Sequence, residues 1–155
     1  MTETTYLIRM LRTSAAEVGD RTALRVKQSG VWRDITWHAY LDAAERIAFG
    51  LAALGVTPGD RVAIQSENRP EWLFCDQASN ALRAAIVGFY PTNPTAEIVY
   101  LLQDSGARVL IAEDQEQVDK ALEAEPHAPD LQWIVALDSR GTSGYDHPKL
   151  LTIDD

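Results

Sequence analysis

The chain is poor in the residues that build disulfides, metal centres and dinucleotide sites. It has a single cysteine, Cys75, so no internal disulfide can form and a buried apolar role is the simplest interpretation. Its three histidines, His38, His127 and His147, have no cysteine or carboxylate at ligand spacing, so we expect no metal site. No Gly-x-Gly-x-x-Gly run follows an expected strand, and this disfavours dinucleotide binding.

Long apolar runs and clustered positive charge are also missing. No stretch approaches the ~18 consecutive apolar residues of a membrane-spanning helix, and Met1-Thr2-Glu3 opens without an apolar signal core. The formal net charge is -9, and the 14 Lys and Arg residues are scattered along the sequence. Nucleic acid and anionic membranes both bind clustered basic residues, so this charge argues against them as partners. We expect a cytoplasmic protein whose parent is at most peripheral to a membrane.

The residues that are present suit one α/β domain. A chain of 155 residues with 46% apolar content can bury one core. Apolar residues recur at helical spacing from Tyr6 to Val18 and again from Trp37 to Leu51. Between them, residues 22–28 and 31–36 are β-rich, and the connection Ser29-Gly30 predicts a hairpin.

One run joins a helix end, a turn, a buried strand and a new helix start. Gly55 can end a helix in the left-handed conformation, and Pro58-Gly59 suits a turn with positive φ at its second central position. Val62-Ala63-Ile64 is short and apolar enough for a parallel strand. Pro70 then opens a helix whose cap position falls to Asn68-Arg69.

The same alternation continues downstream and predicts a mostly parallel sheet flanked by helices, with right-handed crossovers. Thr95 and Asp114 are the expected caps of the next two helices. Thr152-Ile153-Asp154-Asp155 has the cap-x-x-acid pattern that begins another helix. We predict one domain over residues 1–155, made of an N-terminal helix (1–20), a hairpin (21–36), an α/β layer (37–138) and a loop with a truncated helix start (139–155).

The order and spacing of three segments carry a family resemblance. They are Ile35-Thr36-Trp37, the run from Gly55 to Trp72, and residues 84–94, and together they resemble the N-terminal part of the AMP-forming acyl-CoA synthetases of the adenylate-forming superfamily. The form Tyr90-Pro91-Thr92 is most similar to long-chain fatty acyl-CoA ligases. The resemblance implies a parent enzyme that activates a carboxylate with ATP and Mg²⁺ to acyl-AMP and transfers the acyl group to coenzyme A.

The resemblance also implies that the catalytic groups lie in later segments of such enzymes, so we expect none in this chain and no bound cofactor. Residues 142–149 share a Thr-Ser-Gly start and a Pro-Lys end with the family's phosphate loop. They lack its second glycine, and the carboxylate of Asp146 would repel a phosphate. We interpret this stretch as a solvated loop. Glu67 follows a strand but has no partner that would make it a general base.

Tyr90 and Thr92 are the candidate site residues. They follow a strand at its carboxyl end, where ligands collect in parallel sheets, so either could lie beside the substrate or the nucleotide. The alternative is that residues 90–94 form a rigid linker, because each of the two prolines disfavours helix in the residue before it.

Two functions of different kinds follow. In the first, the chain is the N-terminal scaffold of a fatty acid–CoA ligase, inactive by itself, with the remaining subdomains of the parent as partners. Apolar faces left uncovered then predict self-association into a homo-oligomer. In the alternative, the chain is a stand-alone, non-catalytic α/β ligand-binding module, similar in outline to flavodoxin-like domains.

Overall fold

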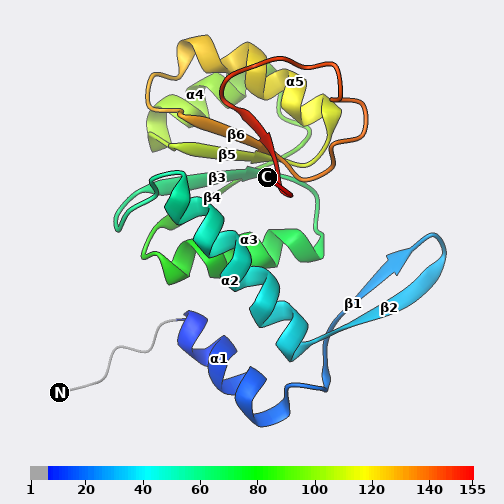
Figure 1. The fold of residues 1–155 in the computed structure, drawn as a ribbon. Helices are drawn as coiled ribbons and strands as arrows, with labels where there is room; N and C mark the ends of the chain where they lie inside the picture. The colour runs from blue at the N-terminus through cyan, green and yellow to red at the C-terminus, as the bar shows by residue number, and fades with distance from the viewer. Residues whose placement is uncertain (1–6) are drawn as a thin grey trace.

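The computed structural model describes residues 7–155, which form a two-stranded and a five-stranded sheet with helices around the larger one (Figure 1). The strands are β1 (Thr22–Gln28), β2 (Val31–Thr36), β3 (Arg61–Gln65), β4 (Ala85–Phe89), β5 (Val109–Ala112), β6 (Trp133–Ala136) and β7 (Leu150–Thr152). The helices are α1 (Leu7–Val18), α2 (Trp37–Ala53), α3 (Pro70–Ala81), α4 (Thr95–Ser105), α5 (Gln115–Ala124) and the short 3₁₀ helix η1 (Glu125–His127). Tyr6, expected in the first helix, lies outside the described residues. Among the residues described, no helix is long and apolar enough to cross a membrane.

The five-stranded sheet is parallel throughout, in the order β4-β3-β5-β6-β7. Helices α2 and α3 cover one face, and α4 and α5 cover the other (Figure 1). Side chains of β3 alternate between these layers, because Val62 and Ile64 join the α2/α3 core while Ala63 joins the α4/α5 core. Burial on both faces explains why this strand reads as a continuous apolar run, and the predicted α/β architecture is confirmed.

The turn before β3 has the predicted conformation. Gly59 has φ +93°, and the N–H of Asp60 donates to the carbonyl of Thr57 at 3.0 Å. The carboxylate of Asp60 accepts a further 2.7 Å hydrogen bond from the N–H of Thr57 and holds the pKa of Asp60 below its usual value. The turn therefore fixes where the chain enters the centre of the sheet.

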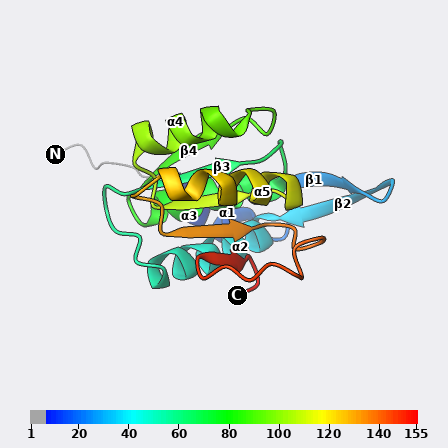
Figure 2. The ribbon, with the colours of Figure 1, turned by 90° about the horizontal axis from the view of Figure 1, so that it is seen from above.

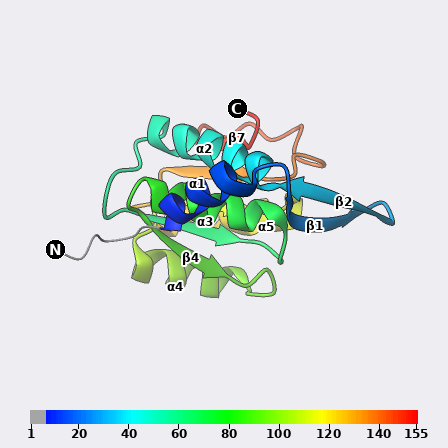
Figure 3. The same cartoon turned by 90° about the horizontal axis from the view of Figure 1, so that it is seen from below.

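The hairpin β1–β2 stands away from the body, as the views from above and below show (Figures 2 and 3). Ser29 and Gly30 both have positive φ, +49° and +81°, as a type I′ turn requires. Leu24 and Ile35, near the base, pack against a small cluster centred on Leu11, Tyr40 and Ala44. A two-stranded hairpin is marginal in isolation, so this base is what anchors it.

The expected cap at Asp114 is confirmed, Thr36 caps α2 in the same way, and the expected cap at Thr95 is wrong. Thr36 accepts from the N–H of Ala39 at 3.1 Å, and Asp114 accepts from the N–H of Gln117 at 3.2 Å. Thr95 is not a cap, because Pro94 precedes α4 as its N-cap and the Thr95 hydroxyl donates instead to Glu123.

Of the two residues expected at the cap position of α3, the structure selects the second and not Asn68. Arg69 occupies the N-cap position and makes no side-chain capping bond, because its guanidinium pairs with Glu71 at 2.8 Å. Pro70 at the first helical position has no N–H, so the start of α3 has one unpaired donor fewer.

The C-terminal segment differs from the sequence expectation. Leu150–Thr152 forms strand β7 beside β6, where a loop and a helix start were expected. The Asp155 carboxylate accepts from the N–H of Thr152 at 2.7 Å and from its hydroxyl at 2.9 Å. The cap-x-x-acid pattern thus closes a turn after a strand, and three residues are too few to show strand periodicity.

Candidate functional site

The strand order creates a topological switch point at β3. β4 pairs with one edge of β3 and β5 with the other. The chain then runs from β3 into α3 on one face and from β5 into α5 on the opposite face. In open parallel sheets, ligands bind in the crevice outside the carboxyl ends of the strands at this point. The residues that follow β3 and β5 are therefore the first candidates for a site.

At this crevice the chain binds its own carboxylate. The backbone N–H of Glu67 donates to Oε2 of Glu113 at 2.6 Å, and Nη1 of Arg69 lies 3.5 Å from Oε1 of the same residue. Nε of Arg69 also donates to Glu71 at 2.8 Å. All three charged side chains, of Arg69, Glu71 and Glu113, are less than one third exposed. We call these residues, with Glu67, the switch-point cluster.

The electrostatics of the switch-point cluster follow from these contacts. The hydrogen bond with Glu71 raises the pKa of Arg69 above its already high value. Burial is the largest single influence and acts to raise the pKa of Glu71, but the hydrogen bond from Arg69, a backbone hydrogen bond and the charge of Arg69 together lower this pKa. Both groups are therefore charged at neutral pH and are paired with each other, whereas the side chain of Glu67 is exposed.

A shallow hollow of about 410 Å³ lies beside the cluster. Its lining residues are Arg69, Glu113, Asp114, Gln115, Glu116, Asp138 and Arg140. Nε of Arg140 donates to Asp138 at 2.8 Å, and this pairing lowers the pKa of Asp138 to about 2. Four carboxyl groups against two guanidinium groups make the hollow unfavourable for a nucleotide phosphate.

Tyr90 and Thr92 lie on the loop between β4 and α4, apart from the switch-point cluster. Tyr90 is 76% exposed and Thr92 is exposed. Within residues 7–155 neither side chain forms a hydrogen bond. The loop itself is held by the N–H of Asn93 on the carbonyl of Tyr90 (3.1 Å) and by Nζ of Lys120 on the carbonyl of Pro91 (2.7 Å). Whether these residues border a substrate or only link strand to helix stays a prediction.

Residues 138–149 connect β6 to β7 as a loop. Its side chains Tyr145 and Lys149 form hydrogen bonds and an ion pair with other parts of the protein. The hydroxyl of Tyr145 donates to Asp119 at 2.5 Å and accepts from Nε2 of Gln115 at 3.1 Å. Nζ of Lys149 donates to the carbonyl of Leu131 at 2.9 Å and pairs with Glu125. The lysine that resembles a phosphate ligand in the sequence is therefore engaged in holding the loop to the α4/α5 side of the sheet.

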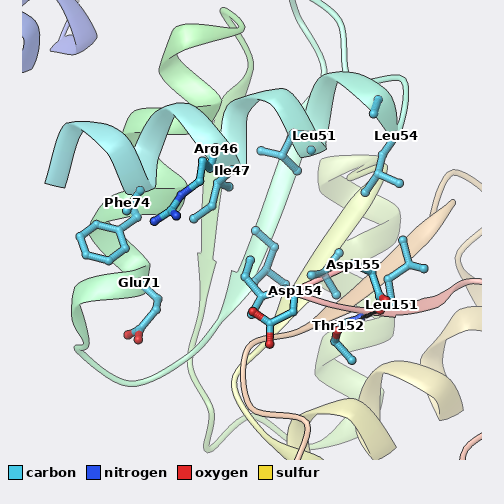
Figure 4. Close-up of a pocket in the computed structure, with 16 residues that line it drawn as sticks. Arg46, Ile47, Leu51, Leu54, Glu71, Phe74, Leu151, Thr152, Asp154 and Asp155 are labelled. Carbon is cyan, nitrogen blue, oxygen red and sulfur yellow. Dashed lines mark hydrogen bonds between the residues drawn. The ribbon is translucent and has the colours of Figure 1, made fainter. Parts of the chain in front are cut away.

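A second, larger cavity was not foreseen from the sequence. It has a volume of about 700 Å³ and lies between α2 and the C-terminal segment (Figure 4). Ile47 and Leu51 on α2 and Leu54, which follows this helix, line the cavity together with Leu151 on β7. Charged groups in the lining come from Arg46, Glu71, Asp154 and Asp155. The periodicity of α2 predicts an apolar face on this helix. The distance between that face and β7 could not be predicted, because β7 itself was not expected from the sequence. The lining suits an apolar group and offers no nucleophile.

Other reactive groups are few in the part of the chain that the structure describes. Cys75 is fully buried in α3, and burial raises the pKa of its thiol to about 12. No three His, Cys, Asp or Glu side chains of residues 7–155 gather as they would around a metal ion.

Comparison with known proteins connects this fold to a family. Residues 11–150 match the family described as AMP-binding enzyme. The chain is 30% identical over 126 residues to a long-chain-fatty-acid–CoA ligase of Bos taurus, covering 81% of the chain and 17% of that protein. It is 35% identical over 117 residues to one of Mycobacterium bovis, covering 76% and 20%. The chain thus spans about a fifth of the length of these relatives.

Solved structures show the same fold. A protein of Rhodopseudomonas palustris assigned as a long-chain-fatty-acid CoA ligase superposes with a TM-score of 0.80 at 28% identity, over 97% of this chain and 36% of that one. Acetoacetyl-CoA synthetase of Streptomyces lividans superposes with a TM-score of 0.83 at 21% identity, over 96% and 24%. At that identity the second likeness supports the fold alone.

Proposed function

Because the chain belongs to the AMP-binding enzyme family, we propose that it is the N-terminal scaffold of an ATP-dependent long-chain fatty acid–CoA ligase and is inactive by itself. In the reaction of the parent, a carboxylate oxygen attacks the α-phosphorus of ATP, which gives acyl-AMP and pyrophosphate. The thiol of coenzyme A then displaces AMP and forms the thioester. We place the parent in the cytoplasm, with its remaining subdomains as the partners of this chain.

The observation that carries the proposal is the switch-point cluster. A scaffold needs its strand ends fixed, and Glu113 does this by accepting from the N–H of Glu67 and pairing with Arg69. Mg²⁺ is expected with ATP in the parent, but residues 7–155 offer no cluster of ligands for it, so we assign none of them to the metal.

The names of the relatives support the choice of substrate class. Both sequence relatives above act, by name, on long-chain fatty acids. The form Tyr90-Pro91-Thr92 adds to this choice. The cavity beside α2 supplies an apolar face against which a further subdomain could pack, and an uncovered face of this kind also predicts self-association of the isolated chain.

The test is a profile of acids accepted by the intact gene product. Thioester formation would be measured with coenzyme A and straight-chain acids from acetate to stearate. We expect the highest kcat/KM with the long acids. Equal or better use of acetate, or no thioester with any acid, would contradict the proposal.

Thr92→Ala in the same intact enzyme separates the two interpretations of the loop. A kcat within about twofold of the unaltered enzyme indicates a linker, whereas a tenfold loss, about 1.4 kcal/mol in the barrier, places Thr92 beside the reacting groups. Glu97→Ala, an exposed change in the first turn of α4, is the matched control.

The 700 Å³ cavity also favours the second candidate, a stand-alone ligand-binding module. Reading the coding sequence beyond residue 155 separates the two. An open frame that contains a Ser/Thr/Gly-rich phosphate loop favours the ligase, and a stop codon there favours the module.

A further inference from the structure

The charges of this acidic chain are divided unevenly. Residues 7–34 hold six of the 14 basic residues and only three of the 23 acidic ones. These six are Arg9, Arg12, Arg21, Arg25, Lys27 and Arg33. The scattered distribution expected from the sequence is therefore wrong: α1 and the hairpin form a positive N-terminal part, and the rest of the protein is strongly negative.

The hairpin carries apolar side chains at its far end. Val31 is 57% exposed and Trp32 is 65% exposed, and they follow directly on the type I′ turn. The cross-strand register pairs Trp32 with Lys27, and Val26 with Arg33, so each face of the hairpin carries one of these two cations beside an apolar side chain. Figures 2 and 3 show the tip projecting well beyond the helices.

The cations near the tip are not neutralised by the protein. Arg25 pairs with Asp34 at 2.8 Å, but Lys27 and Arg33 have no ion-pair partner among residues 7–155. Both are exposed. The tip thus combines an exposed indole, an exposed aliphatic side chain and two positive charges without an ion-pair partner among the described residues, all on a narrow projection.

We propose that this hairpin docks the protein on an anionic lipid surface, with Trp32 and Val31 in the interfacial region and Lys27 and Arg33 on the headgroups. Tryptophan favours the membrane–water interface, and each Lys or Arg near an anionic leaflet strengthens binding about fivefold. A stable protein interface needs about 20 to 30 residues a side, whereas the tip offers the few residues from 27 to 33. One point rests on the proposed function: a long-chain acid dissolves in membranes, so docking would bring the ligase to its substrate.

The test is co-sedimentation of the purified chain with vesicles of phosphatidylcholine alone and of phosphatidylcholine with phosphatidylglycerol. It needs no ligase activity, so its outcome is independent of the proposed function. We expect binding only to the anionic vesicles and release in high salt. The pair Lys27→Glu and Arg33→Glu should weaken binding at least about 25-fold, and Trp32→Ala at least about fivefold.

Matched controls separate the hairpin from net charge and general hydrophobicity. Arg46→Glu with Arg83→Glu changes the net charge equally on exposed sites outside the hairpin, and Phe49→Ala removes an aromatic that is 76% exposed on α2. Both should bind within about twofold of the unaltered chain.

Three outcomes would each overturn the proposal. They are no binding to anionic vesicles, equal losses in the controls, and a dimer in vesicle-free sedimentation that Trp32→Ala dissociates. Far-ultraviolet circular dichroism verifies folding, and the salt dependence of the unaltered chain tests the proposal without any variant.

Discussion

Glu113, at the end of β5, accepts a 2.6 Å hydrogen bond from the backbone N–H of Glu67, at the end of β3. This contact joins the segments that follow β3 and β5 at the switch point of the sheet. The residues lie 46 positions apart in the sequence, and the bond joins the two strands from which the chain departs to opposite faces. In the region where other parallel sheets bind ligands, the chain's own carboxylate thus accepts a backbone hydrogen bond.

Removing that carboxylate should destabilise the fold. Glu113→Ala leaves the N–H of Glu67 without its acceptor and Arg69 without one of its two partners, which predicts a loss of about 1–3 kcal/mol in the free energy of unfolding. Urea denaturation measures it. Asp104→Ala, at an exposed position of α4, should change stability by less than about 0.5 kcal/mol, and equal effects of the two variants would contradict this role of Glu113.

Arg61 lies at the amino end of β3, on the opposite side of the sheet from the switch point. Its Nε donates to the carbonyl of Ser105 at 2.6 Å and its Nη2 to the carbonyl of Gly106 at 2.8 Å, at the C-terminal end of α4. These charge-assisted bonds satisfy carbonyls that the helix leaves open. Arg61→Met should lower stability by about 2–3 kcal/mol. Arg83→Met, an exposed change, should have little effect, and a similar loss in both would refute the clamp.

Asp138 should make the free energy of unfolding depend on pH. Its pairing with Arg140 lowers its pKa to about 2, whereas an aspartate in an unfolded chain titrates near 3.9. The stabilisation is therefore complete above about pH 4 and is lost as the pH falls through 2. Asp138→Asn should be less stable than the unaltered chain at pH 6, and the difference should shrink toward pH 2. Urea midpoints across that range measure it, and a difference that stays constant would show that the ion pair contributes nothing.

The thiol of Cys75 should be inert in the folded protein. It is fully buried, and burial raises its pKa to about 12, so little thiolate forms at neutral pH. An aromatic disulfide reagent should label the chain only in urea. Cys75→Ser, which buries a hydroxyl in apolar surroundings, should cost about 1–3 kcal/mol. Rapid labelling of the native protein would show that α3 opens more readily than its packing implies.

Local chemistry was predictable from the sequence, and contacts between distant residues were not. Gly59 and Ser29-Gly30 specify their turns through a few neighbouring residues, and Val62–Ile64 reads as a buried strand by composition. The contact between Glu67 and Glu113 depends on which strands become neighbours. Strand β7 is too short for a periodic signal, and the choice between Asn68 and Arg69 for the cap position of α3 could not be made from the sequence.

The candidate site followed the same division. Tyr90 and Thr92 could be placed at the carboxyl end of a strand from their position after an apolar run. The cavity beside α2 could not be foreseen, because it needs the distance between a helix and β7. The positive hairpin tip required the cross-strand register as well as the sequence.

The claim that this chain shapes an enzyme without supplying its reactive groups is tested most directly by ATP–pyrophosphate exchange. The purified 155-residue chain would be incubated with ATP, Mg²⁺, palmitate and labelled pyrophosphate. The scaffold role predicts no palmitate-dependent label in ATP above a reaction without protein. Palmitate-dependent exchange by this chain alone would contradict it.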